Sequence, residues 1–228
     1  MGAVLRGRPY CLWECRCTEA SEPAFWRRFN LETDALPHLM MLAPAPVIRL
    51  PDGRLRLDVK FVEGMRAHAA LWKGTVESVL WEGAATIPFG AEYAPDDLGF
   101  MLKVLPQGAR PEVAGADLLA APADMAEALA LAGGPVPVVF VVEYTIGTRL
   151  RIVALDRERG PLRKLRSALW NLSAERQRRR AFRRAAGVQC KGYPAFRPYR
   201  GLSRGTMLYL DGRMRAGMMA TPAEMAAK

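Results

Sequence analysis

Short apolar runs, separated by polar and turn-forming residues, recur along most of the chain. The clearest is 136–144, a continuous Val/Phe-rich run typical of a parallel strand that is covered on both faces. The run at 38–43 (HLMMLA) is the first convincing strand. The same kind of pattern predicts further strands at 75–81, 98–105, 187–191 and 206–210.

Helical periodicity lies between these runs. Phe61, Met65, Ala69 and Trp72 recur at i, i+4, i+8 and i+11, which predicts a helix over 58–72. Asp58 stands where an N-cap belongs, and a glycine follows the end. Other helices are expected at 123–132, in an Arg-rich region that ends at 186, at 194–202 and in the C-terminal TPAEMAAK. The proline-rich stretch 44–53 is expected to be a loop.

This alternation predicts an α/β fold with a mostly parallel sheet and right-handed crossovers. Residues 37–228 form a single domain in this interpretation, and residues 1–36 form an irregular N-terminal extension, because they show no sustained period. No apolar run approaches the length of a membrane-spanning helix, and the N-terminus lacks the apolar centre of a signal peptide. A cytoplasmic location is therefore expected.

The cysteines and histidines do not suggest a metal site. Cys11, Cys15 and Cys17 have a spacing that is unusual for zinc, Cys190 is distant from them in sequence, and the chain has only 2 histidines. We expect no metal and no cofactor. No G-x-G-x-x-G, Walker or G-x-S-x-G motif is present, which argues against a dinucleotide oxidoreductase, a P-loop NTPase and an α/β-hydrolase.

Four stretches resemble bacterial family-4-type glycosyltransferases, which are GT-B enzymes of surface-polysaccharide assembly. They are DVKFVEGMRAHAALW (58–72), IPFGAEY (87–93), VVFVVEYTIGTRLRIVALD (138–156) and GVQCKGYPAFRPYRGLSRGTMLYLDGRM (187–214). The resemblance implies a Rossmann-like three-layer sandwich that corresponds to the acceptor-side half of such an enzyme, with the donor-binding C-terminal domain absent. It implies transfer of a sugar from a nucleotide-sugar donor to a glycan or lipid-linked acceptor, and inactivity without a donor domain.

Polar residues that follow the predicted strands are the candidate site, because ligands of open α/β sheets bind beyond the carboxyl ends of the strands. Glu143 is the candidate catalytic base. The alternatives remain open: Glu143 pairs with Arg149, Lys60 is a solvated helix residue, Gly64 only permits close packing, and Tyr193 begins a turn. The candidate substrate-binding residues are Asp58, Lys60, Gly64, Tyr144, Thr145, Arg149, Gly192, Tyr193, Asp211 and Arg213.

One segment makes the protein basic. The net charge is +10, and residues 149–184 carry 13 Lys and Arg against 3 acids, while the rest of the chain is neutral. A basic amphipathic helix suits an anionic membrane surface. The resemblance to glycosyltransferases, which commonly lie on the inner membrane when their acceptors are lipid-linked, implies peripheral attachment there. The residues assigned to membrane binding are Arg176, Arg178, Arg179, Arg180, Arg183 and Arg184, with Trp170, Leu172 and Phe182 as apolar anchors and Leu162, Leu165 and Leu169 as a second apolar stripe.

Two other interpretations of this segment stay open. It is an ordinary solvated face, or it contacts nucleic acid, although it lacks the interleaved aromatic residues of a base-stacking surface. The alternative function is accordingly a non-catalytic Rossmann-like binding module that docks on membrane or nucleic acid through its arginine helix.

Overall fold

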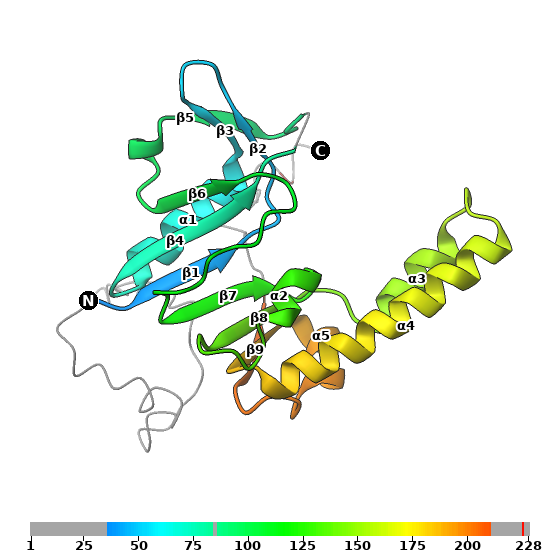
Figure 1. The fold of residues 1–228 in the computed structure, drawn as a ribbon. Helices are drawn as coiled ribbons and strands as arrows, with labels where there is room; N and C mark the ends of the chain where they lie inside the picture. The colour runs from blue at the N-terminus through cyan, green and yellow to red at the C-terminus, as the bar shows by residue number, and fades with distance from the viewer. Residues whose placement is uncertain (1–35, 84–85, 211–224, 226–228) are drawn as a thin grey trace, which may run out of the picture. The chain divides into compact units, whose positions relative to one another are not determined.

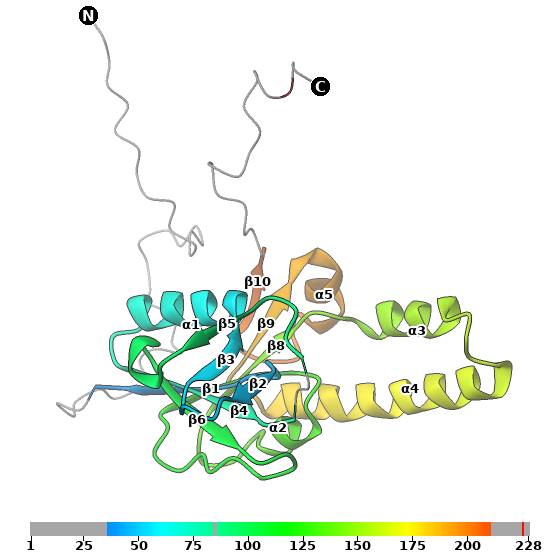
Figure 2. The ribbon, with the colours of Figure 1, turned by 90° about the horizontal axis from the view of Figure 1, so that it is seen from above.

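The computed structural model describes residues 36–83, 86–210 and 225, all of which belong to the unit Ala35–Lys228. Within these ranges, a seven-stranded sheet has the order β10-β9-β8-β7-β1-β4-β6, and every neighbouring pair is parallel (Figures 1 and 2). The strands are β1 (His38–Leu42), β4 (Thr75–Trp81), β6 (Met101–Leu105), β7 (Leu118–Pro122), β8 (Val138–Val142), β9 (Gly187–Lys191) and β10 (Thr206–Tyr209).

The strand order is that of a Rossmann-like fold. The chain begins in the middle of the sheet at β1, moves outward through β4 and β6, then returns to β7 and moves outward in the opposite direction. In such sheets the order reverses at a topological switch point, here between β1 and β7. The predicted α/β class with a mostly parallel sheet is confirmed.

Helices cover both faces of this sheet. In β4 the buried Val79 belongs to one hydrophobic cluster and the next residue, Leu80, to another, so the two side chains point to opposite faces. The cluster of Leu80 contains Val62 of α1 (Val59–Leu71). The cluster of Val79 contains residues of α2 (Ala126–Ala130), α4 (Pro161–Arg184) and α5 (Gly192–Tyr199). The result is a three-layer sandwich.

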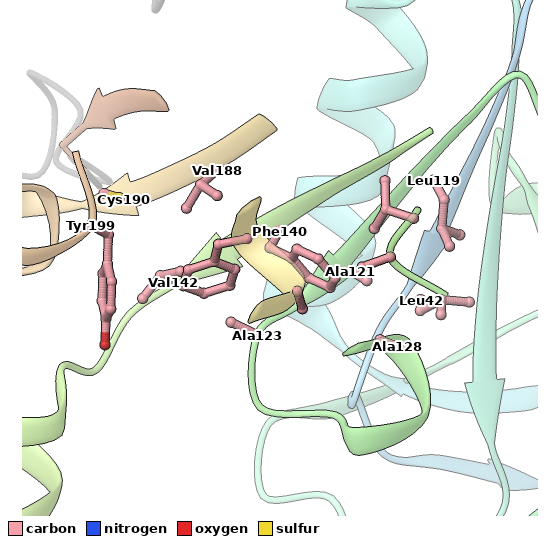
Figure 3. Close-up of a cluster of buried hydrophobic side chains, with 14 of the residues drawn as sticks. Leu42, Leu119, Ala121, Ala123, Ala128, Phe140, Val142, Val188, Cys190 and Tyr199 are labelled. Atoms are coloured by element: carbon pink, nitrogen blue, oxygen red, sulfur yellow. The ribbon is translucent and has the colours of Figure 1, made fainter. Parts of the chain in front are cut away.

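The larger cluster is built on β8 (Figure 3). Phe140 is fully buried and lies 5.6 Å from the ring of Phe182 in α4, which in turn packs edge-on against Tyr199 in α5 at 5.3 Å. Alternate residues of the neighbouring strands, such as Leu119 and Val188, complete the layer. The Val/Phe run that dominates the hydrophobic pattern is therefore the centre of the core.

A second, antiparallel sheet with the order β2-β3-β5 corrects the loop predicted at 44–53. It consists of β2 (Val47–Arg49), β3 (Leu55–Asp58) and β5 (Gly90–Tyr93), and a short 3-10 turn, η2 (Pro95–Asp97), follows. The prolines at 44, 46 and 51 flank β2 without interrupting it, and Leu55 and Leu57 alternate as buried residues of β3. Because these strands are three or four residues long, their alternation is too brief to stand out in the sequence.

The helix predicted at 123–132 is partly wrong as well. Residues 118–122 form β7, the neighbour of β1, and α2 is only five residues long. The sequence of β7 is LLAAP, without a β-branched or aromatic residue, so its intrinsic preference does not favour a strand. Leu119 has no exposed surface, and it is this central position in the sheet that determines the conformation.

The arginine-rich region forms two helices, α3 (Ile146–Leu155) and α4. The turn between them ends at Gly160, and Pro161 occupies the first turn of α4, where its missing N–H costs nothing. Lys164 Nζ donates to the carbonyl of Ala154 at 2.8 Å and ties the two helices together. Figures 1 and 2 show this helical hairpin extending away from the sheet. No helix in the described ranges is long and apolar enough to cross a membrane.

The buried thiol of Cys190 is expected to make the stability of the protein depend on pH. Burial raises the pKa of the Cys190 thiol to about 11 from an ordinary value of 9.0. Well below pH 9 the thiol is protonated in both the folded and the unfolded protein, so it does not change the free energy of unfolding. As the pH rises from 9 to 11, the unfolded chain loses this proton while the folded protein keeps it. We expect the free energy of unfolding to fall by roughly 2–3 kcal/mol across this window.

The measurement is urea unfolding at several pH values for the protein and for Cys190→Ala. The variant should lose this part of the pH slope, although Tyr199 adds a decline of the same sign at higher pH, because burial and the nearby charge of Glu175 raise the pKa of its hydroxyl. Equal slopes in the two proteins would contradict burial of the thiol.

Candidate functional site

The seven parallel strands end at the same edge of the sheet, and the candidate site is built there. β8 and β9 are neighbours in a register that pairs Val142 with Cys190, so Glu143, the first residue after β8, lies beside Lys191, the last residue of β9. Lys191 Nζ donates to Glu143 Oε1 at 2.9 Å. The pair is accessible, with Glu143 47% and Lys191 34% exposed. The alternative pairing of Glu143 with Arg149 is wrong.

Two exposed tyrosines follow this ion pair, one after the end of each strand. Tyr144 comes directly after Glu143 and is 46% exposed, and Tyr193 lies two residues beyond Lys191 and is 58% exposed. Gly192 connects Lys191 to Tyr193 with φ +71°, a left-handed conformation that favours glycine. Tyr193 begins helix α5 rather than an isolated turn. Two aromatic rings therefore follow an accessible carboxylate and an ammonium group.

Thr145 and Arg149 belong to the start of α3, beside this edge. The Thr145 hydroxyl accepts from the backbone N–H of Thr148 at 3.2 Å and caps the helix. Arg149 lies 5.8 Å from the ring centroid of Tyr144 and pairs with Asp124, and its buried Nε has no acceptor among the described residues. The structure thus brings Glu143, Tyr144 and Arg149 into one region.

Asp124 is a further candidate for the site, and the sequence does not predict it. It follows β7, directly at the switch point, and is 46% exposed. Two guanidinium groups approach its Oδ1, that of Arg149 and that of Arg178, whose Nε is 3.5 Å away. The sequence predicts no strand at 118–122, so it gives no reason to expect that Asp124 lies at the carboxyl end of a strand. The Pro-Ala-Asp sequence after an apolar run was the available signal.

Arg178 is buried, which corrects its assignment to a membrane-binding surface. Only 3% of the residue is exposed; its Nε donates to the carbonyl of Ala123 at 3.1 Å and its Nη1 to Glu175 at 3.4 Å. Glu175 is also buried and accepts from Arg179 Nε at 2.8 Å and from the Tyr199 hydroxyl at 3.0 Å. This network joins α4 and α5 to the loop that presents Asp124.

The other predicted membrane residues divide into two groups. Arg179 is partly buried, paired with Glu175 and placed 5.5 Å from the Tyr199 ring, and Phe182 has no exposed surface, so neither is available as predicted. The exposed members are Arg176, Arg180, Arg183 and Arg184, together with the apolar Leu162, Leu165, Leu169, Trp170 and Leu172.

The candidates on α1 are not part of the cluster at β8 and β9. Asp58 caps α1 by accepting from the N–H groups of Lys60 and Phe61, and Lys60 lies 5.1 Å from the ring centroid of Phe89. A Cβ at Gly64 would meet no atom within 4 Å, so close packing does not explain this glycine. α1 packs on β3 of the small sheet and on β4, and in the large sheet β1 and β7 lie between β4 and β8.

Asp211 and Arg213 lie outside the described residues. An open hollow of about 490 Å³ lies beside the small sheet and β6, lined by residues that include Arg49, Leu55, Asp96 and Phe100. It contains none of the predicted site residues. Within the described part of the chain, no group of three or more His, Cys, Asp or Glu side chains could hold a metal ion.

Comparison with known proteins gives a distant structural likeness. No protein-family model and no curated protein matches the sequence. Among solved structures, the chain is similar to Phytolacca americana UGT2 complexed with UDP-2fluoro-glucose and pterostilbene, with a TM-score of 0.41, 10% identity and coverage of 73% of this chain and 50% of that one. For apo UGT2 the TM-score is 0.42, the identity 9% and the coverage 84% and 54%. The chain spans about half the length of these structures.

Proposed function

We propose that this chain is the acceptor-side half of a two-domain GT-B glycosyltransferase. The observation that carries the proposal is the Glu143–Lys191 ion pair at the carboxyl ends of two neighbouring parallel strands, with an exposed tyrosine shortly after the end of each strand. Open α/β sheets bind ligands at this edge. The local resemblance of 138–156 and 187–214 to family-4-type enzymes supports the same assignment, since it covers these residues.

The chemistry of the edge suits a sugar acceptor. Aromatic rings offer apolar faces on which the C–H face of a sugar ring can pack, while Glu143 and Lys191 offer an acceptor and a donor for its hydroxyls. Glu143 is the group that would take the proton of the attacking hydroxyl in an inverting reaction. The acceptor is a glycan or glycolipid, and the nucleotide-sugar donor would bind a second Rossmann-like domain across the cleft.

Binding of the acceptor can be tested on this chain alone. We expect it to bind a subset of oligosaccharides on a glycan and glycolipid array without any donor domain. Tyr193→Ala and Tyr144→Ala should each weaken this binding at least about tenfold, because each removes a packing surface for the ring. Phe89→Ala, which removes an aromatic residue that is 66% exposed on another element, is the matched control and should bind normally.

Catalysis is tested by adding a donor half, encoded by the same or a neighbouring reading frame. We expect sugar transfer only from the combination, and a decrease in kcat of about 100-fold for Glu143→Gln with acceptor affinity retained. The absence of both glycan binding and transfer would contradict the proposal. Transfer that is insensitive to Glu143 would contradict only the role of this carboxylate.

A further inference from the structure

Helix α4 carries one continuous exposed stripe along its whole length. Its members are separated by three or four residues, so they lie on the same side of the helix. The first four are leucines, which are between 41% and 81% exposed, and the last three are exposed arginines. The stripe, called the Leu–Arg stripe below, consists of Leu162, Leu165, Leu169, Leu172, Arg176, Arg180 and Arg183.

The opposite side of α4 faces the domain. Asn171, Glu175, Arg178 and Phe182, also spaced by three or four residues, are the positions that α4 buries along that side. The Leu–Arg stripe therefore points away from the fold, and the core does not need it. Leucines at four successive positions of an outward face are not explained by the stability of this domain, since isolated exposed leucines are common but aligned ones are not.

The apolar half of the stripe lies in the part of the hairpin that extends from the sheet (Figures 1 and 2). Neighbouring positions enlarge the apolar surface of the hairpin: Trp170 is 64% exposed, and Ile152 and Leu155 of α3 are 55% and 77% exposed. Arg163, Arg166 and Trp170 line a shallow hollow on α4. The surface of the hairpin thus carries both large apolar side chains and arginines.

The charges of this surface are uncompensated. Residues 149–184 contain only three acidic residues that could neutralise the arginines. One of them, Asp156, pairs with Arg159, and another, Glu175, is buried with Arg178 and Arg179. Within the described ranges, the three arginines of the Leu–Arg stripe form no ion pair. The surface therefore suits a partner that accepts apolar side chains and supplies negative charge over about 33 Å, the length of 22 helical residues.

We propose that the Leu–Arg stripe docks on the surface of an anionic lipid bilayer. A helix that lies in the plane of the interface places leucines and a tryptophan at the boundary of the acyl chains, and arginines at the phosphates. The anionic bilayer therefore accommodates both the leucines and the arginines of the stripe. This inference is independent of sugar transfer, because it depends only on the exposed face of α4. Of the docking residues expected from the sequence, it keeps the leucines and excludes the buried or paired Arg178, Arg179 and Phe182.

A second copy of the chain fits this stripe poorly. Parallel pairing of two α4 helices would place Arg176, Arg180 and Arg183 against the same arginines, and antiparallel pairing would bury them against leucines. Like charges that face each other and unpaired buried charges both disfavour association. The bilayer avoids both, since its charge is negative and continuous.

The experiment is co-sedimentation of the full chain with vesicles of phosphatidylcholine, with and without phosphatidylglycerol. We expect binding to the anionic vesicles, and a loss of about 100-fold in partitioning for the triple variant Arg176→Gln, Arg180→Gln and Arg183→Gln. The triple variant Leu162→Ser, Leu165→Ser and Leu169→Ser should lose at least about tenfold. These side chains are exposed, so circular dichroism should show both variants folded.

Matched controls remove the same side chains elsewhere. Arg56→Gln, Lys73→Gln and Arg110→Gln lower the net charge equally at exposed positions outside the hairpin. Leu36→Ser, Leu71→Ser and Met101→Ser remove exposed apolar residues, likewise outside the hairpin. Both control variants should bind like the original protein at a salt concentration of about 0.15 M, within about threefold, because charges far from the bilayer are then screened and most of the affinity comes from the stripe.

Trp170 gives an independent readout of insertion. Its fluorescence should shift to the blue on anionic vesicles, and Trp170→Phe should lose that shift while still sedimenting. Three results would overturn the proposal: no binding to anionic vesicles, equal losses in the stripe and control variants, or dimers in solution that the leucine variant dissolves. The last result would identify a second copy as the occupant.

Discussion

Replacing Arg178 by methionine is expected to lower the free energy of unfolding by about 3–5 kcal/mol. The guanidinium group is buried, donates to Glu175 and to the carbonyl of Ala123, and lies 3.5 Å from Asp124. Methionine fills part of the space but leaves Glu175 inside the protein with less compensating charge. Urea unfolding followed by circular dichroism measures the loss directly.

Arg180→Met is the matched control, because Arg180 lies two residues away in the same helix and is exposed. It should change the unfolding free energy by no more than about 0.5 kcal/mol. Adding Glu175→Gln to Arg178→Met should recover part of the loss, since it removes the uncompensated charge. If Arg178→Met and Arg180→Met were equally mild, the buried network would not exist as described.

Replacing Phe182 by alanine is expected to cost about 3–5 kcal/mol of the free energy of unfolding. Its ring is fully buried between Phe140 of β8 and Tyr199 of α5, at centroid distances of 5.6 and 5.3 Å. Truncation leaves a cavity at the point where three elements meet. The measurement is the shift in the urea midpoint at constant m value.

Leu165→Ala provides the comparison, because Leu165 is on the same helix and 58% exposed. Its effect on unfolding should stay within about 0.5 kcal/mol. The two substitutions distinguish the side of α4 that stabilises the fold from the side that is available to a partner. A large loss for Leu165→Ala together with a small one for Phe182→Ala would reverse the orientation of the helix.

Much of the fold could be predicted because its strongest signals are local. The run of β8 is apolar on both faces, as a central parallel strand requires. The α1 helix combines an apolar period with an Asp58 cap, and both are present in the structure. Strands and helices of this kind are specified by residues that are neighbours in the sequence, so their pattern can be recognised without the rest of the molecule.

The candidate site was predictable only where it depends on such elements. Glu143, Tyr144, Gly192 and Tyr193 follow two recognisable strands, and the parallel arrangement of those strands brings them together. Asp124 was missed because the Ala/Leu sequence of β7 does not indicate a strand. Its conformation follows from its position between β1 and β8, which are distant from it along the chain.

In the arginine-rich helix α4, the sequence determines the composition, and the tertiary structure determines which residues are exposed. Local sequence alone predicts a long helical region that ends at 186, is strongly basic and contains large apolar residues, because these properties need only the order of the side chains. The division of this region into α3 and α4 is seen only in the structure. Which arginines face solvent depends on where Glu175, Tyr199 and the end of β7 lie, and tertiary packing determines this. The side of this helix that becomes buried is set by the elements that pack against it. Arg178 is buried against them, whereas Arg180 is exposed to solvent.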